Sequence, residues 1–208
     1  MKACLVNYNF TPSWLLEYPE IDYVIYDRSD SEHYLKDFPP EKVVKTRNIG
    51  NVDNDRLGYL IDNYHDLPDV FLWSKSNLFK YISQKEFDHL KERREFTPLL
   101  TQNHRQYSDK NGIVCFYAGG MYHERNDSWY LGEVPAKHFG SWPEWAKMFG
   151  LPNPPYIPFT PGGNYILTRE TVHKHSRRLY QRMKNTLTYT QLPGEAQLCE
   201  RSYYLLWS

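Results

Sequence analysis

Two glutamates near the end of the sequence have the residue type and placement for proton transfer. Glu195 opens a segment with helical character that runs to residue 207, and Glu200 lies five residues further on. A positioned carboxylate can take a proton from a hydroxyl group and activate its oxygen as a nucleophile. Five residues turn a helix by about 140° beyond one full turn, so the two side chains point in different directions. We expect Glu195 to be the base, because a helix N-terminus can overhang a cleft. Glu200 would then bind Arg201 or the substrate, or be a buried structural partner.

Three basic side chains could hold a phosphate or a diphosphate. Arginine can grip phosphate with two hydrogen bonds, and lysine supplies a point charge. The candidates are Arg47, Arg56 and Lys75. Lys75 has the best position, because it follows the apolar run 70–73 directly and ligands of open α/β sheets bind beyond the carboxyl ends of strands. Arg56 could equally pair with Asp53 or Asp55 nearby.

Alternating strand and helix patterns surround these residues and predict an α/β fold. Six short apolar runs are typical of strands, at residues 3–6, 22–26, 42–45, 70–73, 113–117 and 164–167. Helices or long crossovers separate them, which favours a central, mostly parallel or mixed sheet of about six strands flanked by helices. At 208 residues the chain is long enough for one domain with a sizeable core.

Helices are expected over residues 83–95, 169–187 and 195–207. A further helix follows the turn formers Asn48, Gly50 and Asn51, with Asp53 and Asp55 in its first turn and Tyr64 on its apolar face. That face has apolar residues at i, i+3, i+4 and i+7, and Ser83 with Glu86 forms a capping box at the start of the helix over 83–95. Residues 121–162 hold many Pro, Gly, Trp and Tyr with little periodicity. We expect this stretch to be an irregular wall of a binding cleft, with an acceptor molecule as the expected ligand.

Composition limits the possible classes of protein. The 25 basic and 25 acidic residues give no net charge, which disfavours non-specific binding of nucleic acid. Three cysteines in apolar or helical context indicate reduced thiols in an intracellular protein. No apolar stretch approaches the ~20 residues that span a bilayer, and no signal peptide is evident, so we expect a cytoplasmic protein. Aromatic residues make up 16% of the chain and could stack on sugars or bases, or fill half-buried positions.

Several motifs resemble a glycosyltransferase-like family that was formerly of unknown function. They are Asn48-Ile49-Gly50, Tyr59-Leu60, residues 63–68, Phe71-Leu72, Asn7-Tyr8-Asn9 with Trp14-Leu15-Leu16, Gly162-Gly163 through Thr168-Arg169-Glu170, Glu195-Ala196 and Glu200-Arg201. The resemblance covers nearly the whole chain and is weak over residues 96–158. It implies the two-layered GT-A fold in a single domain, with a nucleotide-binding half at 1–95 and an acceptor and catalytic half at 96–208. A further hypothesis is that the domain is one part of a longer polypeptide.

The resemblance also implies which residues bind a nucleotide-sugar. The base would lie at the ends of the first two strands, and the residues there are Asn7, Tyr8, Asn9, Tyr26, Asp27 and Arg28. Asp27 could accept from the uracil N3–H or from ribose hydroxyls, and Tyr8 or Tyr26 could stack on the base. Gly162 and Gly163 would let the backbone approach the donor sugar. The alternative is that Asn9 and Asp27 cap turns and that the two glycines form an ordinary turn.

A divalent metal, Mn²⁺ or Mg²⁺, is expected from the resemblance, since GT-A enzymes use one to bridge the diphosphate. Their Asp-x-Asp motif is missing here, because the loop after the fourth strand reads Ser74-Lys75-Ser76-Asn77. One alternative is that the diphosphate and water hold most of the metal's coordination sites, with Ser76 or Asn77 assisting. The other is that Lys75 takes over part of the role of the metal. Asp127 is a further candidate ligand.

Together these features predict a metal-assisted, inverting glycosyltransferase. It would transfer a hexose or deoxyhexose, such as glucose or rhamnose, from a UDP-sugar to a growing glycan. The resemblance points to the glycan of a viral capsid glycoprotein, and so to the cytoplasm of a host cell. The alternative is a glycan-binding module that has lost catalysis. A nucleotidyltransferase is a weaker third possibility, because the carboxylate pair for two metals is not evident.

Overall fold

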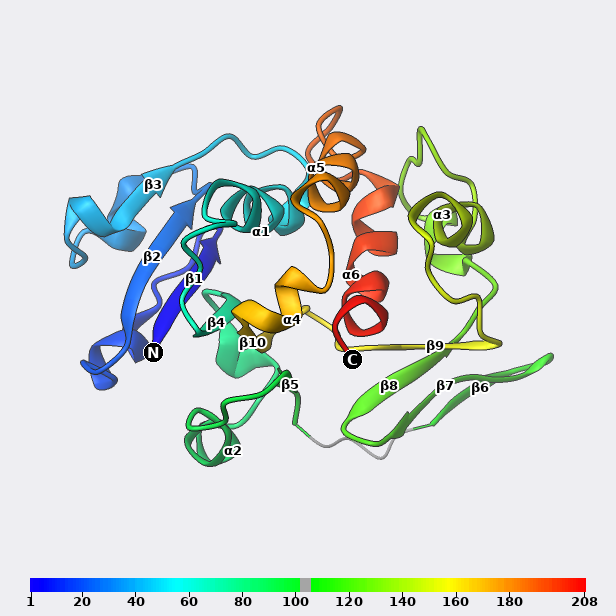
Figure 1. Cartoon of the computed structure of the whole chain (residues 1–208), viewed down its shortest axis with the longest axis horizontal. Coiled ribbons are helices and arrows are strands. Elements are labelled where there is room, and N and C mark those ends of the chain that lie inside the picture. The colour runs from blue at the N-terminus through cyan, green and yellow to red at the C-terminus, as the bar shows by residue number, and fades with distance from the viewer. Residues whose placement is uncertain (102–105) are drawn as a thin grey trace.

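Six strands form the main sheet of the protein, in the order β3-β2-β1-β4-β10-β5 (Figure 1). The structure is a computed structural model that describes residues 1–101 and 106–208. The strands are β1 (Lys2–Asn7), β2 (Asp22–Asp27), β3 (Val43–Lys45), β4 (Val70–Lys75), β5 (Thr97–Pro98) and β10 (Tyr165–Thr168). The first four are mutually parallel, and β10 runs antiparallel to both of its neighbours. The predicted α/β fold with a six-stranded mixed sheet flanked by helices is confirmed.

Apolar clusters cover both faces of the main sheet, because successive side chains of a strand point to opposite faces. Cys4 of β1 and Trp73 of β4 face a cluster shared with α1 (Asn51–Asp62), α5 (Arg177–Asn185) and α6 (Gly194–Trp207). Their neighbours Leu5 and Leu72 face a second cluster. That cluster is closed by α2 (Gln84–Leu90) and by the 3-10 helix Ser13–Glu17; further 3-10 turns span Glu32–Leu35, Pro40–Lys42 and Leu78–Lys80.

A second sheet lies on the far side of α6 from β2 and β3 (Figure 1). Its strands β6 (Tyr107–Asp109), β7 (Gly112–Ala118), β8 (Met121–Arg125) and β9 (Tyr156–Phe159) are antiparallel in sequential order. Gly119 and Gly120 form the two-residue turn between β7 and β8 with φ of 60° and 84°. A turn with positive φ at both central residues matches the twist of the strands, and glycine adopts it without strain.

The expectation of an irregular segment at 121–162 is wrong. The segment contains β8, the 3-10 helix Trp129–Gly132, α3 (Trp142–Phe149) and all of β9. The buried residues of α3 recur at i, i+3, i+4 and i+7, but the helix is short and its tryptophans resemble the aromatic residues of the surrounding loops. The helix expected over 169–187 is two helices, α4 (Arg169–His173) and α5, because Ser176 caps α5 with its side chain.

Helix α6 joins the two sheets. On one side, the phenol of Tyr203 donates a hydrogen bond of 2.7 Å to Asp53 of α1. On the other, the guanidinium of Arg201 binds both carboxylate oxygens of Glu124 of β8, at 2.5 and 3.0 Å, and both side chains are 5% exposed. Within the part of the chain that the structure describes, no helix has the length and hydrophobicity to span a membrane.

Candidate functional site

A cleft of about 200 Å³ lies beyond the carboxyl ends of β1 and β4. β1 pairs in parallel with β2 on one side and with β4 on the other. From β1 the chain adds β2 and then β3 on the first side, and it then returns to add β4 on the second. The direction of the strand order therefore reverses at this point, and ligands of open α/β sheets bind at such a reversal. The polar residues that line the cleft include Asn7, Tyr8, Arg28, Lys75, Ser76 and Asn77. These six were all expected at the site from the sequence.

Positive charge gathers around the cleft. The ammonium of Lys75 lies 3.5 Å from the hydroxyl of Tyr81 and 5.4 Å from the centre of its ring. Arg28 lines the same cleft but donates to the carbonyl of Ile49 and lies 3.2 Å from Asp55, which neutralises much of its charge. The first residues of α1 complete the wall, and a helix N-terminus favours anions. Lys75 is therefore the main cation that a ligand would meet.

Three buried polar atoms of the lining residues lack hydrogen-bond partners in the described structure. Nε of Arg28 lies 3.2 Å from the carboxylate of Asp55, to which it is attracted by charge. The other two are Oδ1 of Asn7 and Oγ of Ser76, in residues that are 0% and 2% exposed. The amide group of Asn7 is held in place because it donates to Asp27 and to Ser29, at 3.1 and 3.0 Å. Leaving a buried polar group unpaired costs about 1–3 kcal/mol. Such atoms at a cleft are therefore natural partners for a polar ligand.

Three of the residues expected to bind the base have other partners. Asp27 is 1% exposed, and its carboxylate binds Asn7, Lys45 and the backbone of Ser29. Burial alone would raise the pKa of Asp27, but these hydrogen bonds outweigh it and lower the pKa. Asn9 binds Asp30, and Tyr26 packs against Tyr59 of α1. Asp27 is thus a turn-capping residue, and of the two tyrosines only Tyr8, which is 50% exposed, lines the cleft.

Arg56 is not placed to hold a phosphate. It is 1% exposed, its guanidinium donates to the carbonyl of Gly162 and to Asn164, and it lies over the ring of Trp73. The pairing with Asp53 or Asp55 expected as the alternative is not formed either. Arg47 is exposed and is not among the residues that line the cleft.

Gly162 and Gly163 are required by the packing of the protein itself. They have φ of 84° and 59°, and a Cβ atom would lie 2.6 Å from the ring of Tyr81 at Gly162 and 2.9 Å from the guanidinium of Arg56 at Gly163. Their close neighbours are therefore these two side chains, so the glycines themselves give no evidence for a donor sugar.

The expectation that Glu195 overhangs a cleft is wrong. Its residue is 0% exposed, and its carboxylate accepts from the backbone N–H groups of Lys137 and His138, at 2.9 and 2.5 Å. The hydroxyl of Tyr189 donates to its other oxygen at 2.6 Å. A carboxylate with three donors and no exposure fastens the loop around residue 137 to α6. It has no access to a substrate.

Glu200 is the glutamate that remains accessible. Its side chain is 20% exposed, and one carboxylate oxygen accepts from the N–H of Gly162 at 2.8 Å. The other oxygen lies 3.9 Å from the guanidinium of Arg201. Gly162 lies in the turn that precedes β10, two residues before Asn164, whose side-chain oxygen accepts from the backbone N–H of Lys75. Glu200 therefore lies beside the end of β4, on the side of the cleft where Tyr81 stands.

Comparison with known proteins places the chain in a family. Residues 7–208 match a family model described as "Protein of unknown function (DUF3431)". The chain belongs to the DUF3431 family. The match includes the six polar residues of the cleft and both glutamates of α6. Searches of curated proteins and of solved structures found no match.

Sequence reasoning missed two features of this DUF3431 site. Tyr81 lines the cleft and packs on Gly162, but it lies six residues past Lys75 and nothing in its neighbourhood marks it. From the sequence, Asp53 is expected only as a charge in the first turn of a helix and as an alternative partner of Arg56. It is 2% exposed, and burial raises its pKa to about 6; Glu200 adds to the rise, whereas Arg56 and the hydrogen bond from Tyr203 oppose it.

The residues of this DUF3431 cleft do not fit a metal ion held by the protein. Ser76 and Asn77 line the cleft, but Asp127 lines a different cavity on the small sheet and binds Arg125 at 2.6 Å. No Asp or Glu is among the described lining residues, whereas Lys75 and Arg28 are. Mg²⁺ and similar ions are bound through carboxylates or substrate phosphates. The described residues also hold no cluster of three His, Cys, Asp or Glu that could bind a metal.

Proposed function

We propose that the protein is a glycosyltransferase that takes a hexose or deoxyhexose from a UDP-sugar and transfers it to a growing glycan. The observation that carries the proposal is the cleft at the β1/β4 reversal, where Lys75, the N-terminus of α1 and the unpartnered atoms of Asn7 and Ser76 meet. This combination suits an anionic ligand that also has hydroxyl groups. The resemblance of the sequence motifs to a glycosyltransferase-like family supports the same reading.

The size of the cleft limits which part of the donor it holds. At about 200 Å³ it is smaller than the ~300–1,000 Å³ of sites for whole drug-sized ligands. It has room for the diphosphate with part of the ribose. The base would lie outside, on the exposed ring of Tyr8, and the donor sugar would lie toward Tyr81.

Glu200 is the base in this proposal. Its carboxylate takes the proton from an acceptor hydroxyl, and the hydroxyl oxygen attacks the anomeric carbon. The bond from that carbon to the diphosphate oxygen breaks, UDP leaves with the electron pair, and the proton stays on Glu200. Attack from the face opposite the leaving group inverts the anomeric centre. The hydrogen bond from the N–H of Gly162 fixes one oxygen of Glu200 and leaves the other for the acceptor.

Lys75 supplies the positive charge that this cleft offers to the leaving diphosphate. Because no described carboxylate lines the cleft, a Mn²⁺ or Mg²⁺ ion would enter with the diphosphate, with Ser76 and Asn77 as neutral neighbours. No step of the proposed reaction therefore depends on a metal ion. The free protein is expected to bind no Mn²⁺ at this site.

Calorimetric titration with UDP, GDP and CMP, in Mn²⁺ and in EDTA, tests the proposal. We expect UDP to bind, and Lys75→Met to weaken its binding roughly 10- to 100-fold, since hydrogen bonds to charged groups contribute about 1.5–3 kcal/mol. Lys80→Met is the matched control, because Lys80 is exposed and lines a different cavity. Absence of binding by all three nucleotides in both conditions would refute the donor site.

The role of Glu200 is tested separately. Glu200→Gln should reduce transfer by a factor of about 10² to 10⁴, measured as UDP released from a UDP-sugar in the presence of acceptor, and leave UDP affinity unchanged. Full activity of this variant would remove Glu200 from the mechanism.

A glycan-binding module without catalysis is the second candidate. The observation that favours it is the burial of Glu195 together with the lack of a carboxylate among the described residues of the cleft. Such a module would bind saccharides and no nucleotide, so the titration above separates the two functions.

A further inference from the structure

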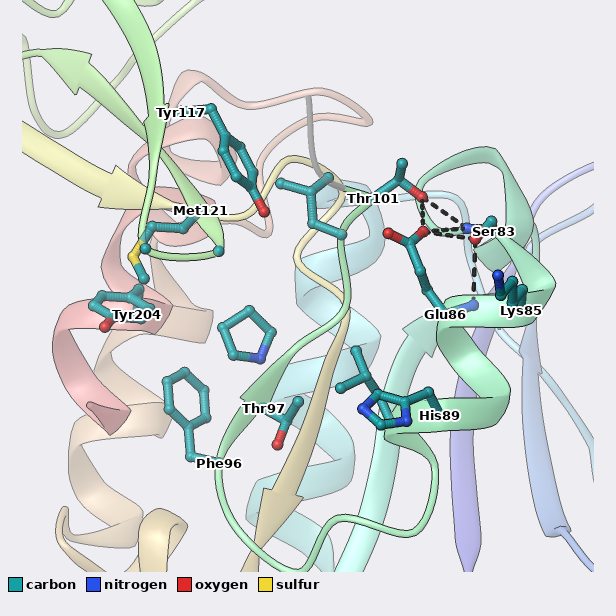
Figure 2. A pocket seen from close by; sticks show the side chains of 15 residues that line it. Ser83, Lys85, Glu86, His89, Phe96, Thr97, Thr101, Tyr117, Met121 and Tyr204 are labelled. Atoms are coloured by element: carbon teal, nitrogen blue, oxygen red, sulfur yellow. Dashed lines mark hydrogen bonds between the residues drawn. The ribbon is translucent and has the colours of Figure 1, made fainter. Parts of the chain in front are cut away.

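A second and larger cavity lies beyond Tyr81, and the donor site does not use it. Its volume is about 880 Å³, against about 200 Å³ for the cleft. It is bounded by α2, by the edge strand β5 of the main sheet and by the Gly119–Gly120 turn of the small sheet (Figure 2). Tyr204 of α6 closes one side. This size is that of a small-molecule site.

The cavity has two chemically different walls. Phe96, Met121 and Tyr204 lie together on one side, and the ring centres of Phe96 and Tyr204 are 5.7 Å apart (Figure 2). The opposite side carries Glu86, whose carboxylate accepts from the hydroxyl groups of Ser83 and Thr101 at 2.6 and 2.5 Å. An apolar aromatic wall thus faces a polar wall, to which Lys85 and His89 also belong.

A pyranose ring has the same two-sided character. The C–H bonds of its face pack on aromatic rings, and the hydroxyl groups of its edge bind carboxylate and hydroxyl oxygens. A purely apolar ligand would cover the Glu86 carboxylate with hydrocarbon, which costs free energy. A strongly charged ligand would leave the aromatic wall without suitable contacts. The lining therefore favours a neutral saccharide.

The cavity adjoins the candidate catalytic residue. Glu200 and Tyr204 lie four residues apart on α6, and such pairs face the same side of a helix about 5–6 Å apart. Tyr81 connects the two sites, because its ring lines the cleft and its carbonyl accepts from the N–H of Thr101 at 2.8 Å. Thr101 in turn lines the cavity.

We propose that this cavity binds the saccharide acceptor, with one pyranose ring packed on Tyr204 and Phe96 and its hydroxyl groups directed to the polar wall that includes Ser83, Glu86 and Thr101. The assignment as acceptor site rests on the proposed function, whereas the binding of a saccharide does not. The acceptor would then lie in the space between the two sheets, and not along the wall expected over residues 121–162.

Nuclear magnetic resonance titration of the full chain with maltotriose, cellotriose and chitotriose, each up to 20 mM, tests the proposal. We expect at least one to shift the amide signals of Gly119, Gly120 and Tyr204. Tyr204→Ala should weaken that saccharide roughly three- to tenfold, as loss of an aromatic contact does, and Tyr204→Phe should retain it. Trp129→Ala is the matched control, because Trp129 is 47% exposed and lines a separate cavity on the small sheet.

Each outcome is decisive. Binding of none of the three saccharides, or binding that shifts signals around Trp129 and is lost in Trp129→Ala, overturns the proposal. Saccharide binding at Tyr204 with UDP binding unchanged in Tyr204→Ala supports it. Saccharide binding at Tyr204 in a protein that binds no nucleotide supports the pocket and refutes the transferase, so the two failures are distinguishable.

Discussion

Replacing Asp53 with asparagine should make the protein more stable at neutral pH, because it removes a buried charge from the first turn of α1. Asp53 is 2% exposed, and its hydrogen bond comes from the phenol of Tyr203 at 2.7 Å. Burial is the largest cause that raises its pKa, from 3.8 to about 6. Asparagine can accept the same hydrogen bond without a charge, so Asp53→Asn removes the cost of burying a carboxylate.

The sign and size of the effect follow from the two pKa values. Because the folded state binds this proton more tightly than the unfolded state, the penalty is absent below about pH 3.8 and complete above about pH 6. A shift of about two units at 1.36 kcal/mol each amounts to roughly 3 kcal/mol. As the pH rises from 4.5 to 7.5, the free energy of unfolding of the wild-type protein should fall by about 2 kcal/mol relative to that of Asp53→Asn.

Urea denaturation of both proteins at half-unit steps from pH 4.5 to 7.5 measures this difference. Every other titrating group is common to the two proteins, so their difference isolates Asp53. Curves that stay parallel within about 0.5 kcal/mol would refute the assignment of a buried, ionised carboxylate. A relative loss of stability that accumulates up to about pH 6 and levels off above it would confirm the assignment and show that Asp53 is buried at a cost in stability.

Three further changes test the architecture around the site. Glu195→Gln should destabilise the protein by about 1–3 kcal/mol in urea denaturation, because it weakens three hydrogen bonds to one carboxylate, and should leave UDP affinity unchanged. Arg201→Met should cost about 3–5 kcal/mol in the same assay by leaving Glu124 buried and unpaired, and Glu124→Leu in addition should recover most of the loss. Gly163→Ala should lower the thermal midpoint, since its φ is 59° and a Cβ would lie 2.9 Å from Arg56; an unchanged midpoint would contradict the packing described.

The main sheet could be predicted from the sequence because its signals are local. β1, β2 and β4 are short apolar runs, and α1 has one apolar face after a Gly-containing turn. The capping box of Ser83 and Glu86 was also predicted and forms as expected. The same local signals placed Lys75 and Ser76 directly after a buried strand, which is where the cleft lies.

The second sheet and the partners of the charged residues could not be predicted in this way. β8 contains His123, Glu124 and Arg125, so its sequence does not alternate as a half-buried strand usually does. Glu124 is buried there because Arg201, 77 residues later, pairs with it. Likewise the burial of the Glu195 carboxylate depends on the N–H groups of a loop that is distant in the sequence. Such pairings depend on tertiary contacts that no local pattern encodes.

The position of α6 between the sheets has a consequence for synthesis. Ribosomes add residues from the N-terminus at roughly 5–20 per second, so every strand of both sheets leaves the ribosome before the helix that joins them. Until α6 docks, Glu124 has no Arg201 and Asp53 has no Tyr203. The space between the two sheets therefore takes its final shape only after α6 has left the ribosome and docked between them.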